Sequence, residues 1–181
     1  DSFDGNKASG SYGEGAAIKC SGNQINLTVK NSTFKNNFAT VRGGAIYAMG
    51  NVSIESSVFM DNNAGNAKSI YVYGAKLNIE NSIILDENAI NSSAGASVVA
   101  NNNWWGTNDK PNDINDAVNI TNWVKMKADY SPNDANTGDE IVITAVFDND
   151  RLPQGILTVT FTSNSGKLNQ IVKVKNAKAN V

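Results

Sequence analysis

One pattern recurs three times in the chain, in segments that begin at Leu27, Val52 and Leu77, at a constant step of 25 residues without a gap. Five positions coincide in all three segments: two aliphatic residues, a serine, a bulky apolar residue and an alanine. A fixed period of roughly 20 to 50 residues is the sequence signature of solenoids and other repeat architectures. The chain is therefore expected to contain a solenoid of stacked coils.

Each repeat alternates apolar and polar residues with a period of two, as in Leu77 and Ile79 with Asn and Glu between and after them. This alternation is typical of a half-buried strand, and helix-favouring residues nowhere gather into a helical face. A leucine-rich repeat would need its own leucine frame and a helical return segment, and neither is present. The sequence predicts an all-β fold, namely a right-handed parallel β-helix of roughly 25-residue coils followed by a partial Ig-like β-sandwich.

Equivalent positions in successive coils of a β-helix lie about 4.8 Å apart and stack directly on one another. We therefore expect an apolar ladder, a hydrogen-bonded amide ladder and a row of alanines at a tight turn. Asn and Gly adopt positive φ at low cost, which explains why Asn is so abundant. The apolar ladder is Phe3, Phe34, Phe59, Ile84 and Trp105, the amide ladder is Asn6, Asn37 and Asn62, and the alanines are Ala39, Ala64 and Ala89.

The second half of the chain follows another pattern. The repeat is expected to stop after Gly106, and polar residues 107–122 are expected to form a capping loop or linker. Trp104, Trp105, Trp123 and Val124 are expected to cover the end of the solenoid. Short strands separated by turns are then predicted at 141–147, 155–161 and 168–174. We interpret 1–124 as the C-terminal coils and cap of a β-helix, and 125–181 as an Ig-like sandwich that is incomplete at its C-terminus.

Composition excludes several function classes. The chain has no His and a single Cys, Cys20, which removes imidazole catalysis, intrachain disulfides and Cys-based metal clusters. With 15 Lys+Arg against 17 Asp+Glu, it lacks the basic footprint of a nucleic-acid binder. No apolar run is long enough to span a membrane. No cofactor is expected.

Acidic residues are the remaining candidates for chemistry. Asp61 and Asp86 lie one repeat apart and are expected to stack with Asn36, so they could share a calcium ion, although a solvated turn is the preferred interpretation. Arg42, the single Arg of the repeat region, has no acidic residue at the equivalent position of either neighbouring coil in this alignment. A further calcium set of Asp109, Asp113 and Asp116 lacks the EF-hand glycine and terminal Glu.

Five N-glycosylation sequons are present, and about four would arise from this Asn, Ser and Thr content alone, so their number is not evidence of glycosylation. They begin at Asn26, Asn31, Asn51, Asn91 and Asn119.

The repeat resembles known surface proteins. Gly43 to Ile46 reads Gly-Gly-Ala-Ile, and Phe34 to Asn37 reads Phe-x-x-Asn, which are similar to the paired motifs of polymorphic outer membrane proteins. The segment Asn31 to Tyr47 and the Asn-Trp-Trp-Gly run at Asn103 to Gly106 resemble the adhesin-like surface proteins of methanogenic archaea, over about residues 1–124. Residues 125–181 resemble the Ig-like repeats of bacterial invasin-type proteins.

This resemblance implies a cell-surface, extracellular adhesin-like module, a rigid rod carried on Ig-like spacers, that is not an enzyme. Its partners would be glycans, other surface proteins or neighbouring copies, with no nucleic acid and with membrane contact only through regions outside this chain. Two alternatives remain open: a polysaccharide-acting β-helix enzyme whose active coils lie upstream, and an architectural surface or fibre subunit completed by a neighbouring chain.

Overall fold

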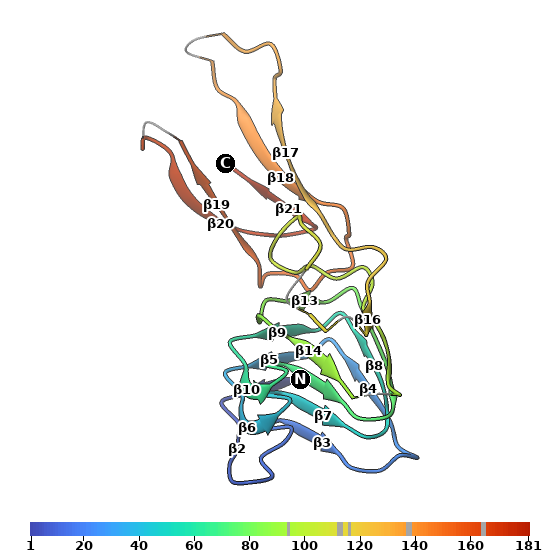
Figure 1. The fold of residues 1–181 in the computed structure, drawn as a ribbon. Coiled ribbons are helices and arrows are strands. Elements are labelled where there is room, and N and C mark those ends of the chain that lie inside the picture. Colours follow the sequence, from blue (N-terminus) through green and yellow to red (C-terminus); the bar gives the residue numbers. More distant parts are fainter. Residues whose placement is uncertain (94, 112–113, 116, 137–138, 164–165) are drawn as a thin grey trace.

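A computed structural model describes residues 1–93, 95–111, 114–115, 117–136, 139–163 and 166–181. All of its regular elements are β-strands. Figure 1 shows stacked coils from which two antiparallel hairpins project at one end. The predicted parallel β-solenoid is therefore confirmed, and the described residues contain no helix that is long and apolar enough to cross a membrane.

The solenoid consists of four parallel sheets, which grow by one strand for most successive coils. Sheet A contains β1 (Ser2–Asp4), β5 (Thr33–Lys35), β9 (Val58–Met60) and β13 (Ile83–Ile84). Sheet B contains β2 (Lys7–Ala8), β6 (Phe38–Arg42) and β10 (Asn63–Asn66). Sheet C contains β3 (Ile18–Cys20), β7 (Ile46–Ala48), β11 (Ile70–Val72) and β14 (Ile90–Ser92). Sheet D contains β4 (Asn26–Lys30), β8 (Asn51–Glu55), β12 (Lys76–Glu80), β15 (Ser97–Val99) and β16 (Val118–Asn119).

One row of turns explains part of the Asn content. The residue between sheets D and A has positive φ in four successive coils, a conformation that Asn tolerates better than most residues. These turn residues are Asn31, Ser56, Asn81 and Asn102, with φ of 47°, 48°, 52° and 58°.

The last full coil is shorter than the constant repeat implies. Ala39 pairs with Ala64 in sheet B, so these two alanines stack as predicted, but they lie in strands and not at the predicted tight turn. Ala8 continues this row in the first coil. Ala89 does not join them, because its carbonyl accepts hydrogen bonds from Ser69 and Ile70 at the start of sheet C. This coil passes from sheet A to sheet C without a strand in sheet B, which leaves β10 as the outer strand of that sheet.

The predicted end of the repeat at Gly106 was wrong. Val118 and Asn119 form a further strand on β15, and Val118 and Ile120 belong to the solenoid core. Residues 107–122 therefore include a piece of the solenoid and are not only a capping loop. The sequence pattern did not predict this strand, because its apolar residues Val118 and Ile120 follow a long polar segment.

The antiparallel region forms two sheets. Sheet E contains β17 (Met126–Ser131), β18 (Val142–Phe147) and β21 (Lys178–Asn180), in the order β17-β18-β21. Sheet F contains β19 (Thr158–Thr162) and β20 (Asn169–Lys173).

The antiparallel region covers the end of the solenoid. The Trp104 ring meets the Phe147 ring edge-on, with centroids 5.0 Å apart, and one apolar cluster contains Ile83 and Trp104 together with Leu157. Beside this contact, the Asn149 amide donates to Asn81 Oδ1 and to the Asn102 carbonyl, both at 3.0 Å. A buried aromatic contact and bridging hydrogen bonds thus join the two regions.

Candidate binding surface

The apolar ladder lies inside the coils. Phe3, Phe34 and Phe59 stack nearly parallel, with ring centroids 4.7 and 4.8 Å apart. Ile84 pairs with Phe59 in sheet A, and Trp105, the fifth residue of the expected ladder, is buried in the same core. This row fills the interior of the solenoid and offers no space for a ligand.

The amide ladder runs beside it. Asn6 Nδ2 donates to Asn37 Oδ1, and Asn37 Nδ2 donates to Asn62 Oδ1, both at 2.8 Å. Each acceptor oxygen also receives the backbone N–H of the residue that donates to it. The next member is Asp86, whose carboxylate accepts from Asn62 N at 3.0 Å and from Asn62 Nδ2 at 2.8 Å.

A third row of buried polar side chains lies at the start of sheet A. Ser57 Oγ accepts from the backbone N–H of Ser32 at 3.2 Å, and Ser82 Oγ accepts from that of Ser57 at 3.1 Å. Asn103 Oδ1 ends the row by accepting from Ser82 N at 2.9 Å. The coincident serines of the repeat are thus hydrogen-bonded pieces of the frame, a role that the alignment alone did not assign.

The two calcium candidates lie in different surroundings. Asp61 is exposed at a turn with φ of 57°, whereas Asp86 is half-buried and receives hydrogen bonds from Asn62 and Ser69. The expected stacking of Asp86 with Asn36 and Asp61 was wrong, because the turn before Asp86 is one residue shorter. In the described part of the chain no three Asp, Glu, Cys or His side chains gather as a metal site, and Asp113 and Asp116 lie outside it.

Burial is the main cause of an altered acidity at Asp86. It raises the pKa of the Asp86 carboxyl above the ordinary value of 3.8, while the hydrogen bonds from Ser69 and Asn62 act in the opposite direction and the Asp61 carboxylate adds to the rise. The folded protein therefore binds a proton at Asp86 more readily than the unfolded chain does.

This shift predicts a pH-dependent effect of Asp86→Asn. Because the folded state binds the proton more tightly, the contribution of Asp86 to stability falls as pH rises through its raised pKa. The amide of the variant keeps an acceptor for Asn62 and carries no charge. We therefore expect the difference between the melting temperature of the variant and that of the unaltered chain to increase in favour of the variant from pH 3 to pH 7. Melting curves across this range test it, with Asp61→Asn as the control. A difference that does not change with pH would contradict this interpretation.

A cluster of aromatic and charged side chains lies outside the coils along sheet C. The Tyr47 and Tyr71 rings stack with centroids 6.0 Å apart, Lys19 lies over Tyr47, and Arg42 lies over Tyr71. Burial, followed by the Glu14 carboxylate, raises the pKa of Tyr47. Both rings are almost fully covered, so this cluster stabilises the outer face and presents no open aromatic platform.

Arg42 does have an acidic neighbour, contrary to the expectation from the alignment. Glu14 pairs with Arg42 across adjacent coils, with 3.8 Å between carboxylate and guanidinium, and Glu14 also lies 3.2 Å from the Lys19 ammonium. The first coil is longer than the constant step, so Glu14 falls outside the positions that the repeat aligns.

A polar groove of about 640 Å³ runs along the outer strand of sheet B. It exists because the shortened coil adds no strand beside β10, and Gly65 within β10 contributes no side chain. We call it the amide groove, after a row of linked Asn side chains among its lining residues, Asn66, Asn91 and Asn115. Asn91 Nδ2 donates to Asn66 Oδ1 and Asn115 Nδ2 donates to Asn91 Oδ1, both at 2.6 Å.

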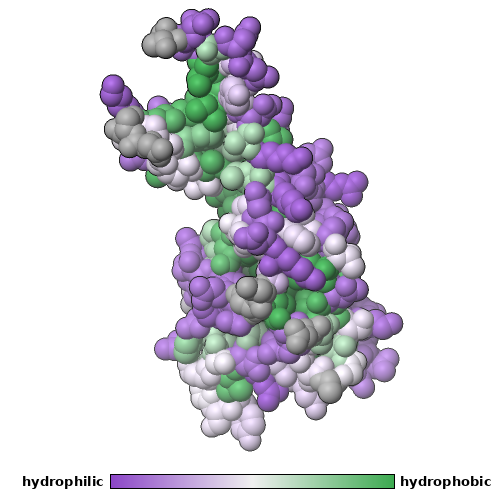
Figure 2. Space-filling view, turned by 45° about the horizontal axis from the view of Figure 1, so that its top comes forward, coloured by the Kyte–Doolittle hydropathy of each residue, from purple (hydrophilic) through white to green (hydrophobic). Residues whose placement is uncertain are grey.

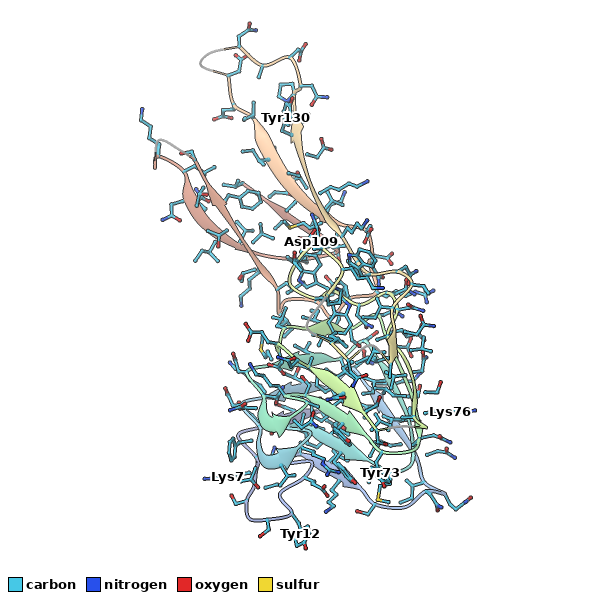
Figure 3. All side chains as sticks on the ribbon, in the orientation of Figure 1. Lys7, Tyr12, Tyr73, Lys76, Asp109 and Tyr130 are labelled. Atoms are coloured by element: carbon cyan, nitrogen blue, oxygen red, sulfur yellow. The ribbon has the colours of Figure 1, made fainter. Side chains whose placement is uncertain are left out.

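The amide groove is suited to a hydrogen-bonding ligand. The linked amides hold one another in place, and the Lys68 ammonium at the groove forms an ion pair of 3.2 Å with Glu87. Figure 3 shows the labelled Lys7 and Lys76 on other parts of the solenoid, directed away from it. The groove can therefore offer fixed amide donors and acceptors together with one cation.

The sequon asparagines differ in accessibility. Four of them are exposed, on strands of sheet D or at the turn before sheet A, and the fifth, Asn91, is half-buried in the amide groove with its Nδ2 already donating to Asn66. The exposed ones are Asn26, Asn31, Asn51 and Asn119. Glycosylation at any of the five stays a prediction.

Comparison with known proteins gives one family match. Residues 31–49 match the Chlamydia polymorphic membrane protein repeat. The matched stretch contains Phe34 and Asn37 of the two ladders and the Gly-Gly-Ala-Ile turn into β7. No curated protein and no solved structure matches the chain.

Proposed function

We propose that this chain is a structural and binding module of a cell-surface, adhesin-like protein, located outside the cell. The observation that carries the proposal is the match of residues 31–49 to a polymorphic membrane protein repeat, within a solenoid whose coils share continuous ladders. Such ladders make a stiff rod, because every coil is held to its neighbours by the same buried contacts.

The antiparallel region is proposed to be an Ig-like spacer similar to those of invasin-type proteins. Its two sheets, E and F, enclose an apolar cluster that includes Ala145, Phe161 and Val174, as expected for a sandwich. Packing against Trp104 would fix the direction of the rod relative to the spacer. An origin in a methanogenic archaeon and a non-enzymatic role are parts of the same proposal.

Attachment is proposed to use the amide groove, with a glycan as the ligand. Sugar hydroxyls both donate and accept hydrogen bonds, and they match a surface of fixed amides better than they match an apolar pocket. The Lys68 ammonium would favour glycans that carry a carboxylate or sulfate.

Blocking the groove should abolish attachment. Asn66 is exposed, and Asn66→Tyr places a large side chain in the groove and removes the acceptor for Asn91. We expect binding to a glycan array to be lost in this variant and kept in Asn78→Tyr, which makes the same exchange at an exposed position of sheet D. Equal loss in both variants would place binding elsewhere, and no binding to any glycan by the unaltered chain would refute this mode of attachment.

A further inference from the structure

Strand β19 has one free edge. It pairs only with β20, and the flanking hydrogen bonds from Val174 N to the Leu157 carbonyl and from Ser163 N to the Leu168 carbonyl fix which residues face that partner. Because backbone groups alternate in an antiparallel ladder, Val159 and Phe161 also point toward β20. The backbone N–H and C=O groups of Thr158, Thr160 and Thr162 then point to the other edge, where the described part of the chain provides no partner strand.

This edge lacks the protection that the other outer strands carry. Natural edge strands commonly hold charged residues that discourage pairing with another chain. Of the outer strands in sheets E and F, β17 carries Lys127 and Asp129, β20 carries Lys173 and β21 carries Lys178. Strand β19 reads Thr-Val-Thr-Phe-Thr and has no charge, and its three threonines are exposed.

The sequence of β19 is also complementary to itself. If two copies pair antiparallel about Thr160, Thr158 of each lies opposite Thr162 of the other, and Val159 lies opposite Phe161. Threonine pairs and aromatic pairs with β-branched residues are among the favourable cross-strand contacts. In this register all three edge-facing threonines exchange both backbone hydrogen bonds, and the apolar side chains stay on the inner face.

We propose that β19 is a self-association surface, through which two copies of this chain form a symmetric dimer with one continuous four-stranded sheet, β20-β19-β19-β20. Pairing of identical strands about a two-fold axis is an isologous contact, which closes and does not propagate. This inference goes beyond the proposed attachment function and does not depend on the amide groove.

An apolar groove adjoins the free edge of β19. The groove has a volume of about 420 Å³ and is bordered by Thr158 and Thr160 together with Met60, Leu85 and Ile156. Leu85 and Ile156 are exposed, at 39% and 38%. Figure 2 shows hydrophobic residues over the antiparallel region, bordered by hydrophilic ones. In the proposed register Thr162 of the second copy lies opposite Thr158, which borders this groove.

The first test is the mass of the 181-residue chain by light scattering over a concentration series. We expect a dimer at the higher concentrations and a monomer for Thr160→Lys at the same concentrations, because two lysines would then face each other across the axis. Asn169→Lys, on the far edge of the same hairpin, should remain dimeric. Matching melting curves of the two lysine variants exclude misfolding as the cause.

The second test fixes the register. Directly opposite, hydrogen-bonded residues have Cα atoms about 5.5 Å apart, within the range that a disulfide spans. Thr160→Cys should therefore give a covalent dimer on oxidation, whereas Asn169→Cys should not. A chain that stays monomeric at every concentration, or a dimer that is unaffected by Thr160→Lys, overturns the proposal.

Discussion

Replacing Phe59 by alanine is expected to lower the free energy of unfolding by about 3 to 5 kcal/mol. Phe59 is fully buried, its ring stacks on Phe34 at 4.8 Å, and Ile84 follows it in the ladder. The neighbouring coils cannot move into the vacated space, because their backbones are held at the strand spacing by the four parallel sheets. The lost apolar contacts therefore leave a cavity. Urea unfolding monitored by circular dichroism gives the value.

Phe38→Ala is the matched control for Phe59→Ala. Phe38 is 37% exposed in the adjacent sheet B, where its ring lies under the Lys7 ammonium at 5.7 Å. Loss of this contact should cost about 1 kcal/mol or less. Similar losses in the two variants would show that the phenylalanine ladder does not carry the stability of the solenoid.

Replacing Asn62 by leucine should cost at least about 3 kcal/mol, although leucine is similar in size and more apolar. Asn62 accepts two hydrogen bonds from Asn37, and it donates to the Phe34 carbonyl and to Asp86. All of these partners stay in a buried or half-buried place after the exchange, and each unpaired group costs about 1 to 3 kcal/mol. Chemical denaturation measures the loss.

The neighbouring residue provides the comparison for Asn62. Asn63 is exposed on the outer strand β10, and Asn63→Leu removes no side-chain hydrogen bond of the amide ladder. We expect a change of less than about 0.5 kcal/mol. If Asn62→Leu were equally mild, water would have to replace the ladder partners, and the interior would be less dry than the stacked rings suggest.

The sequence predicts well those side-chain positions that the constant step of 25 residues aligns in successive coils. Phe34 and Phe59, or Asn37 and Asn62, fall on the same position of successive coils, and a solenoid stacks such positions by its geometry. The fold class of the first half and the ladder residues of the 25-residue coils follow from that constant step, with the exception of Asp86. The Asn-rich turns follow as well, since positive φ recurs at each of them.

What the sequence predicts poorly lies where the coil length changes. The turn before Asp86 is one residue shorter, which moves this carboxylate into the amide ladder, and the missing strand in sheet B moves Ala89 to sheet C. The amide groove results from that omission, and no residue pattern marks it. The constant step also fails to predict the pair of Glu14 and Arg42, because the first coil is longer than 25 residues.

The direction of the buried hydrogen bonds between coils affects how such a chain can change in evolution. In the Asn and Ser rows every hydrogen bond to a side-chain oxygen of the same row has its donor in one coil and its acceptor in the following coil. A duplicated or deleted segment of 25 residues would therefore restore the same bonds at its two junctions, and the rod would simply gain or lose height. A gain or loss of one residue within a strand would instead turn ladder side chains outward. Genetic recombination in whole coils is thus the change in length that this frame tolerates best.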